Sequence, residues 1–206
     1  MALAAAAVSL ALSGSVTAGI APLYVVSSTS MMPTLGESDL VAGSLYDPDW
    51  HPERGDIILY REAGTIYASR VVGLPGEAVA MANGSVLIDG KSLVSQPLAN
   101  PIEAGCPEFF APKARCRFLR ETTPEGHSYV TLDSQDDGFL DTVRPIEIPA
   151  GHVFVLGDNR DNSMDSRVSS HGTVPQEAIV GKVVSIMFST RPGSWPERLD
   201  GFPKHH

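Results

Sequence analysis

Cysteine is scarce in this chain, which has only Cys106 and Cys116 among its 206 residues. Two cysteines cannot complete a four-ligand zinc site by themselves, and nothing else in the sequence implies a metal or an organic cofactor. If the domain lies outside the cytoplasm, the two thiols should pair. Closing so short a loop would stabilise the fold by at most about 3 kcal/mol on the chain-entropy model.

Basic residues are also in short supply, with 15 Lys and Arg against 24 Asp and Glu and a net charge of -9. Binding to nucleic acid requires a basic face that neutralises phosphates, so we expect no nucleic-acid partner. The sequence shows no long amphipathic helix after residue 26 and no internal repeat. The 19 Gly and 16 Pro, together with short Val and Ile runs, predict a mainly β protein.

Charge is absent altogether between Ala2 and Val26. This run is long enough to cross a bilayer, which takes about 20 residues, although it is mostly Ala interrupted by Ser, Thr, Gly and Pro. It fits either a helical membrane anchor or a cleavable signal peptide cut near residues 18–21. We favour the anchor, because cleavage would leave the polar stretch that follows close to a free end. Only Met1 precedes the run, whereas basic residues are usual there, so we expect the natural chain to begin further upstream.

Two polar stretches are candidate sites. Residues 27–34 read Ser-Ser-Thr-Ser-Met-Met-Pro-Thr, and the proline stops a helix and favours an extended or turn conformation before it. This would place Ser30 at a strand end, as suits a nucleophile, although a polar linker would look similar. Residues 157–167 contain three Asp, two Asn and two Arg. Their spacing does not fit a calcium loop, so we expect ion pairs within the loop that hold nearby hydroxyls in place.

The remainder of the chain predicts short strands separated by turns. The expected strands are 39–46, 57–60, 66–72, 79–81, 86–88, 151–156 and 179–188, and the pairs Asn83-Gly84 and Asp89-Gly90 predict tight hairpins. Residues 92–150 have fewer β-branched runs and more Pro and charge, as expected of an insertion or second subdomain. We therefore expect an N-terminal segment (1–26), a β core (27–91 and 151–190), the insertion with both cysteines (92–150) and a loosely ordered tail (191–206).

Four motifs, in order, resemble the type I signal peptidases, which are membrane-anchored serine proteases. The motifs are residues 28–34, 54–58 (Arg-Gly-Asp-Ile-Ile), 70–77 (Arg-Val-Val-Gly-Leu-Pro-Gly-Glu) and 157–167. The resemblance implies two antiparallel β-sheet subdomains after the apolar segment. It also implies a monomer with a single span in the cytoplasmic membrane, in contact with lipid, and with the catalytic domain on the outer side. Its partners would be the signal peptides of exported preproteins.

The resemblance also implies roles for individual residues. Ser30 corresponds to the nucleophile. Its own N–H and the hydroxyl of Ser28 correspond to the oxyanion hole, where each donor is typically worth about 3–4 kcal/mol. Ser163 corresponds to the hydroxyl that orients the general base, and Asp165 and Arg167 correspond to a supporting salt bridge.

One position departs from the family. Bacterial members carry a lysine just before the third motif, and burial lowers its pKa so that it can act as the general base. Here this residue is Ser69, whose hydroxyl is far too weak a base near neutral pH. A serine nucleophile without its base keeps only a residual acceleration of about 10³–10⁴ over water. Ser69 is therefore a trapping substitution, a mark of a natural inactive relative, a misaligned position, or a sign of another base. The candidates for another base are Lys91, Lys182, His152 and His171.

These observations predict a signal peptidase I, a serine endopeptidase that cuts at Ala-x-Ala-like sites. By the same resemblance, the substrate would add as a strand beside Ser27 and residues 67–68, with small residues one and three positions before the cut. The alternative is an inactive relative that binds signal peptides without cleaving them. A self-cleaving repressor-type protease shares the Ser–Lys mechanism, but the apolar N-terminal segment and the lack of a basic DNA-binding domain disfavour it.

Overall fold

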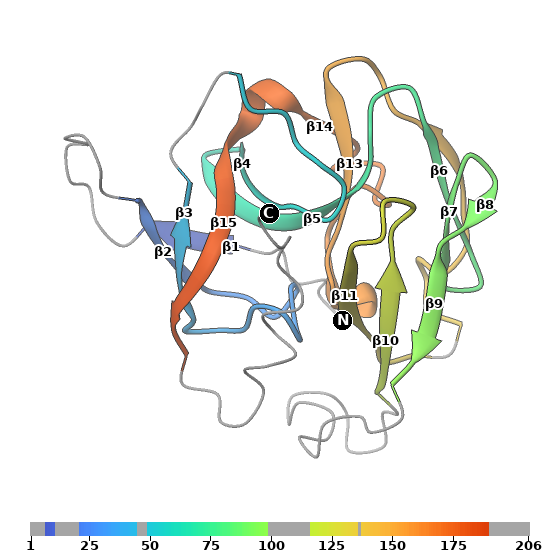
Figure 1. Cartoon of the computed structure of the whole chain (residues 1–206), viewed down its shortest axis with the longest axis horizontal. Helices are drawn as coiled ribbons and strands as arrows, with labels where there is room; N and C mark the ends of the chain where they lie inside the picture. Colours follow the sequence, from blue (N-terminus) through green and yellow to red (C-terminus); the bar gives the residue numbers. More distant parts are fainter. Residues whose placement is uncertain (1–6, 11–20, 45–48, 99–115, 136, 190–206) are drawn as a thin grey trace.

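The computed structural model describes residues 7–10, 21–44, 49–98, 116–135 and 137–189, and it is built from antiparallel β-sheets (Figure 1). The mainly β, antiparallel fold expected from the sequence is thereby confirmed. The largest sheet contains β1 (Ala7–Leu10), β2 (Leu23–Val26), β3 (Leu40–Gly43), β4 (Ile57–Glu62), β5 (Thr65–Gly73), β13 (His152–Leu156), β14 (Val174–Pro175) and β15 (Ile179–Phe188). Each expected strand has a counterpart among the observed strands.

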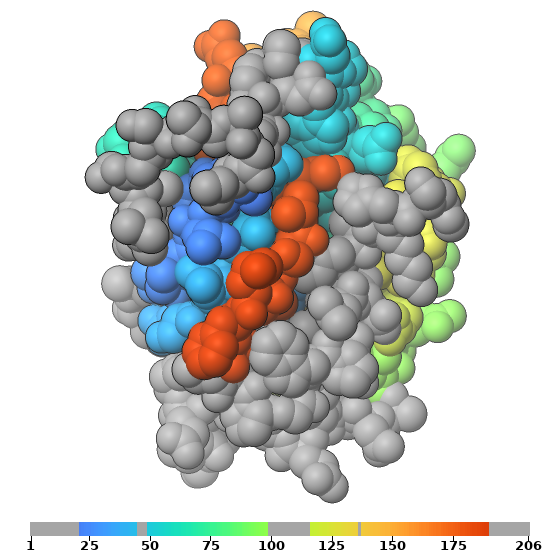
Figure 2. Space-filling model, turned by 60° about the vertical axis from the view of Figure 1, so that its left-hand side comes forward, coloured from blue at the N-terminus to red at the C-terminus, as the bar shows by residue number. Residues whose placement is uncertain are grey.

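Six strands of the largest sheet close on themselves in the order β1-β2-β3-β15-β4-β5, because β1 pairs with both β2 and β5. A closed sheet leaves none of these six strands with an open edge. The strands β13 and β14 extend the sheet from β5. In Figure 2, β15 runs diagonally across one face of the molecule beside the blue strands of the N-terminal third, in agreement with its pairing with β3.

Two smaller sheets lie at the right of Figure 1, on the side of the molecule away from β2 and β3. One contains β6 (Ala78–Ala82), β7 (Ser85–Ile88), β8 (Lys91–Ser92) and β12 (Val143–Glu147), and the other contains β9 (Val94–Pro97), β10 (Arg117–Thr122) and β11 (Ser128–Asp133). Two short 3₁₀ turns, η1 (Arg160–Asn162) and η2 (Gln176–Ala178), complete the described elements. The expected division into core and insertion stays a prediction, and β6 of the core pairs with β12 of the insertion.

The N-terminal segment was expected to be a helical anchor. Its described parts are strands, β1 and β2, and the rest of residues 1–26 lies outside the described residues. Within the described part of the chain, none of the helices has the length and apolar character needed to span a bilayer. Cys116 is disulfide-bonded, while its expected partner Cys106 and the tail 191–206 also fall outside the described residues.

Tight turns fix the register of the strands that carry the candidate site. The expected turns at Asn83-Gly84 and Asp89-Gly90 have positive φ at both residues, and so does Ala63-Gly64 between β4 and β5. Two consecutive positive φ values match the right-handed twist of paired strands in a hairpin. The β4–β5 turn places Ile58 opposite Ser69. Since opposed side chains share a face of the sheet, Ser69 lies on the same buried face as Ile58.

Candidate active site

Ser30 lies in a tight turn directly after β2. The backbone N–H of Leu35 donates to the carbonyl oxygen of Met31 at 2.8 Å, and both side chains are buried in the hydrophobic core. This anchoring holds the buried Ser30 beside Ser28, with 3.2 Å between their hydroxyl oxygens. The Ser30 N–H also points to the Ser28 Oγ at 3.4 Å. The structure therefore brings together the two groups expected to form the oxyanion hole.

The polar loop that follows β13 is fastened to this turn. The backbone N–H of Asn159 donates to the carbonyl oxygen of Ser30 at 2.9 Å. The side-chain amide of Asn159 donates to the carbonyl oxygen of Thr29 at 3.0 Å, and that of Asn162 donates to the Thr29 hydroxyl at 2.8 Å. These bonds satisfy polar groups that would be costly to bury alone. They hold the first and fourth motifs in contact.

Gly157 is the point at which the loop comes closest to the nucleophile turn. A Cβ added there would lie 2.2 Å from the hydroxyl oxygen of Ser163 and 2.6 Å from the carbonyl oxygen of Ser30. Only glycine fits so close an approach. Ser163 is fully buried, and its hydroxyl has no hydrogen-bond partner among the described residues. An unpaired buried hydroxyl next to a proposed nucleophile is therefore available to a reacting group.

Ser69 stands in the slot of the family's lysine and is buried on β5. Its hydroxyl lies 3.3 Å from the hydroxyl oxygen of Tyr60 on β4. The β13–β5 pairing sets Leu156 opposite Arg70, and continuing this antiparallel register by one residue brings Gly157 beside Ser69. The register thus places Ser69 on the strand beside the start of the loop that carries Ser163.

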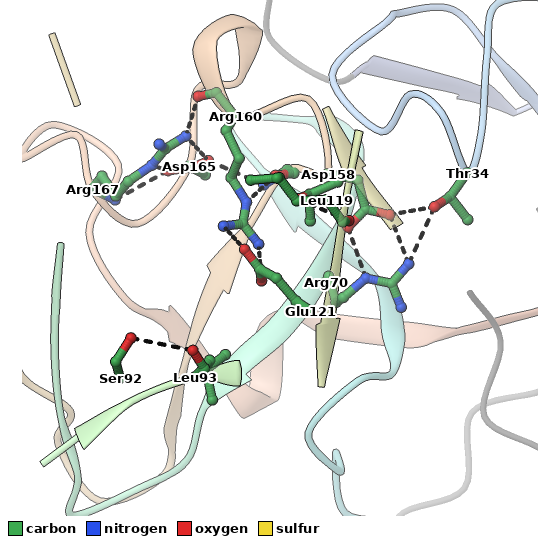
Figure 3. Close-up of polar contacts among 12 residues, drawn as sticks. Thr34, Arg70, Ser92, Leu93, Leu119, Glu121, Asp158, Arg160, Asp165 and Arg167 are labelled. Carbon is green, nitrogen blue, oxygen red and sulfur yellow. Dashed lines mark hydrogen bonds and ion pairs between the residues drawn. The ribbon is translucent and has the colours of Figure 1, made fainter. Parts of the chain in front are cut away.

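Asp165 and Arg167 form the ion pair that the resemblance implied (Figure 3). Both carboxylate oxygens accept hydrogen bonds from the guanidinium, at 2.8 and 2.7 Å, and the backbone N–H of Gly157 donates to the same carboxylate at 3.0 Å. Burial alone would raise the pKa of the Asp165 carboxyl, but the Arg167 charge and these hydrogen bonds lower it below its ordinary value. The supporting role of the pair in catalysis stays a prediction.

Arg70 and Asp158 form a second buried ion pair (Figure 3). The hydroxyl of Thr34 donates to Asp158 at 2.5 Å, and Arg70 donates to the carbonyl oxygen of Gly55 at 2.7 Å. The Arg70 guanidinium also lies 4.2 Å from the ring centroid of Tyr129. The four sequence motifs therefore meet in one network, with Arg70 and Asp158 at its centre.

The third buried pair joins Arg160 to Glu121 at 2.7 and 2.6 Å. The sequence predicted ion pairs within the loop, and this holds only for Asp165 with Arg167. Asp158 and Arg160 instead pair with residues from β5 and β10, which lie far away in the chain. The third remaining charge, Asp161, accepts hydrogen bonds from the backbone N–H groups of Ser134 and Gln135. The excess of Asp over Arg in the loop was the one available sign that an external arginine was needed.

The candidate replacement bases lie in different places. Lys91 is exposed on β8. Lys182 lies two strands from Ser69, with Ile58 between them. Its Nζ is 3.2 Å from a carboxylate oxygen of Asp56. The Nδ1 of His152 is 3.2 Å from the carbonyl oxygen of the neighbouring Ala150. The two remaining lysines of the chain, Lys113 and Lys204, lie outside the described residues.

His171 is connected to Ser69. Its Nε2 lies 2.9 Å from the hydroxyl oxygen of Tyr60, which bonds to Ser69, and its Nδ1 lies 2.7 Å from a carboxylate oxygen of Glu62. Sequence reasoning named His171 but missed Tyr60 and Glu62. Both stand on β4 two positions apart and therefore on one face of the strand. Tyr60 could have been identified from the sequence, because it is a polar-tipped residue that directly follows the aliphatic run Ile57-Ile58-Leu59.

Comparison with known proteins agrees with this geometry. A family model described as signal peptidase, peptidase S26, matches residues 1–188. A signal peptidase I of Rickettsia bellii is 30% identical over 84% of this chain and 67% of its own length. One of Pseudomonas fluorescens is 32% identical over 84% of this chain and 65% of its own length. The chain thus spans about two thirds of the length of these relatives.

A crystal structure of a signal peptidase I from Enterococcus faecalis is 28% identical to this chain, covers 69% of it and 100% of the solved chain, and has a TM-score of 0.38. The structural likeness carries no argument at that score, and the assignment rests on the sequence match over nearly the whole chain. The resemblance inferred from the four motifs is confirmed. The chain belongs to the signal peptidase family, peptidase S26, a family of serine endopeptidases.

Proposed function

We propose that this protein removes signal peptides from exported preproteins, with Ser30 as the nucleophile. The observation that carries the proposal is the packing of Ser30 against Ser28 on one side and against the loop containing Ser163 on the other. In the reaction, the Ser30 Oγ attacks the carbonyl carbon of the scissile peptide bond. The Ser30 N–H and the Ser28 hydroxyl donate to the oxyanion that develops, an interaction whose loss typically lowers kcat by about 10²–10³.

The substrate would bind as an extended strand. The short strand β1 supports this mode, because it lies between β2 and β5 and pairs with both. Val8 stands opposite Val26 and Ile66, and Ala7 stands opposite Tyr67. These are the strand edges at which the resemblance places the substrate. The chain's own Ala-Val-Ser-Leu segment therefore occupies the channel that a preprotein would enter by main-chain hydrogen bonding.

We propose small side chains one and three positions before the cut, in keeping with the Ala-x-Ala sites that the family resemblance implies. The location that we propose is the cytoplasmic membrane, with the catalytic domain on the outer side, as a monomer without a nucleic-acid partner. The disulfide at Cys116 supports an oxidising compartment. The net charge of -9 disfavours nucleic acid.

The test is cleavage of a purified precursor that carries an Ala-x-Ala site. The expected result is a single cut directly after that site, located by mass spectrometry of both products. Ser30→Ala serves as the matched control, since it removes one oxygen atom from the site and should abolish the cut while leaving precursor binding intact. An equal rate for the two proteins would show that Ser30 is not the nucleophile. A cut elsewhere in the precursor would contradict the substrate assignment.

A further inference from the structure

A serine protease needs a group that takes the proton of its nucleophile, and no lysine of the described chain fills the usual slot. Ser69, which occupies it, cannot keep that proton. A serine hydroxyl can, however, accept one proton while donating another. The question is therefore where a proton received by Ser69 would go next.

We propose, building on the function proposed above, that His171 is the terminal proton acceptor of this enzyme and is reached through Tyr60 and Ser69. The distances along the path are 3.3 Å from Ser69 Oγ to Tyr60 Oη and 2.9 Å from Tyr60 Oη to His171 Nε2. Glu62 lies behind the imidazole, 2.7 Å from its Nδ1. Each member hydrogen-bonds to the next, so the path is continuous from the lysine slot to the histidine.

Glu62 sets the direction of the path. An ionised carboxylate only accepts hydrogen bonds, so the Nδ1 of His171 must carry the proton that it shares with Glu62. The Nε2 of a neutral imidazole is then an acceptor. Tyr60 therefore donates to His171, and Ser69 donates to Tyr60. This orientation is the one needed to move a proton away from Ser69 and onto the imidazole.

The surroundings of Tyr60 disfavour loss of its proton to leave a tyrosinate. They therefore favour passage of a proton through the Tyr60 hydroxyl to His171. Tyr60 is buried, and burial raises the pKa of its hydroxyl well above the ordinary value, an effect that the hydrogen bond with Ser69 only partly offsets. The charges of Asp165 and Glu62 raise this pKa further. Tyr67 encloses the path, with ring centroids 5.7 Å from Tyr60 and 6.0 Å from His171. The titratable groups that face the path are thus Glu62 from β4, Tyr67 from β5 and Asp165 from the loop.

The last link joins Ser69 to the nucleophile. Leu156 stands opposite Arg70, the residue after Ser69, and a Cβ added at the next residue, Gly157, would meet Ser163 and the carbonyl oxygen of Ser30. The Ser163 hydroxyl is buried and has no hydrogen-bond partner among the described residues, which leaves it available to a neighbouring serine in the substrate complex. Catalytic hydrogen bonds are often long before substrate binds and tighten in the complex. In the proposed path, Ser163 makes the link from Ser30 to Ser69 once substrate is bound.

The proton balance of the step is simple. The Oγ–H bond of Ser30 breaks as its oxygen forms a bond to the scissile carbonyl carbon, and the carbonyl π electrons move to the oxyanion. Ser163, Ser69 and Tyr60 each take up one proton and release one, and the last proton binds His171 Nε2. The imidazolium is stabilised by Glu62. The same proton returns along the path to the leaving amine when the C–N bond breaks.

The experiment measures kcat and KM for precursor cleavage in the full chain. His171→Ala and Tyr60→Phe should each lower kcat by about 10²–10⁴, the usual contribution of general acid–base catalysis, with little change in KM. Ser69→Lys should restore cleavage in the His171→Ala background, because it supplies a base directly in the slot.

Two matched controls are His152→Ala, which removes a histidine whose Nδ1 contacts the carbonyl oxygen of Ala150 and no member of the path, and Lys182→Met, which removes the rival base. Both should cut at the wild-type rate. The proposal is overturned if His171→Ala and Tyr60→Phe cut normally while Ser30→Ala is inactive, an outcome that leaves the proposed function standing. It is equally overturned if the wild-type protein does not cleave the precursor whereas the Ser69→Lys variant does. If neither the wild-type protein nor the Ser69→Lys variant cleaves the precursor, the proposed function fails as well.

Discussion

Arg70 and Asp158 lie 88 positions apart in the chain and form a bidentate ion pair in which each side chain is only 1% exposed. The pair links β5, which carries Ser69, to the loop that carries Ser163. Burying two charges is costly, and breaking such a pair by removing one partner typically destabilises a protein by about 3–5 kcal/mol. The ion pair therefore makes the placement of the site sensitive to either residue.

We expect Asp158→Asn to lower the free energy of unfolding by about 3–5 kcal/mol, because it leaves the Arg70 guanidinium buried without a counter-charge. Chemical denaturation would measure the loss. The matched control is Arg117→Met, which breaks the exposed pair with Asp133 and should cost about 1 kcal/mol or less. Similar losses for both variants would contradict the importance assigned to burial.

The second prediction concerns the acid side of the stability curve. The pKa of Asp165 is lowered in the folded protein below its ordinary value of 3.8, so the folded state binds this proton less tightly than the unfolded chain. The stability that Asp165 contributes is therefore fully present above the ordinary value and is lost as pH falls through the lowered one. Asp165→Asn should be less stable near neutral pH and should show a flatter loss of stability below about pH 4. Parallel curves for the two proteins in denaturant titrations would count against this.

The third prediction tests the close approach at Gly157. Gly157→Ala would place a methyl group 2.2 Å from the Ser163 hydroxyl, and overpacking of this kind typically costs about 1–3 kcal/mol. Because the methyl group also meets the Ser30 carbonyl, we expect precursor cleavage to fall more than stability alone explains. Gly151→Ala is the control, since Gly151 has a φ of +74° and no atoms within 4 Å of an added Cβ. It should cost stability through backbone strain yet leave cleavage per folded molecule unchanged.

Much of the fold could be predicted because its determinants are local. Alternating and aliphatic runs predicted the strands, and Asn83-Gly84 and Asp89-Gly90 predicted hairpins that require two positive φ values. The strands β10 and β11 were not expected, since their segment has few β-branched runs. They are stabilised by pairing with each other and with β9, which is information that no local window contains.

Only those residues of the candidate site that lie in the four motifs could be predicted from the sequence. Ser28, Ser30 and Ser163 were identified by resemblance, and the structure brings them together. The partner of Arg160, Glu121, comes from the expected insertion, so the loop sequence did not reveal it. Tyr60 looked like an ordinary core residue. The role proposed for its hydroxyl depends on its contacts with Ser69 and with His171, which the long loop after β13 brings in.

The final prediction concerns β1. If this strand occupies the substrate channel, a precursor must displace it before binding, and the fraction of molecules with β1 in place raises the apparent KM. Val8→Pro removes a backbone N–H and breaks the ladders to β2 and β5. Each lost hydrogen bond is worth about 0.5–1.5 kcal/mol, so the KM for precursor should fall by about two- to tenfold with kcat unchanged.

Amide exchange provides an independent measurement of the same change. The amides of Ile66 and Tyr67, which stand opposite β1, should exchange faster in Val8→Pro and should be protected again when a precursor peptide is added. Val94→Pro, on the exposed edge strand β9, controls for a general effect of proline on the fold. If Val8→Pro instead raised KM, β1 would be part of the binding surface, and the substrate would have to add elsewhere on the sheet.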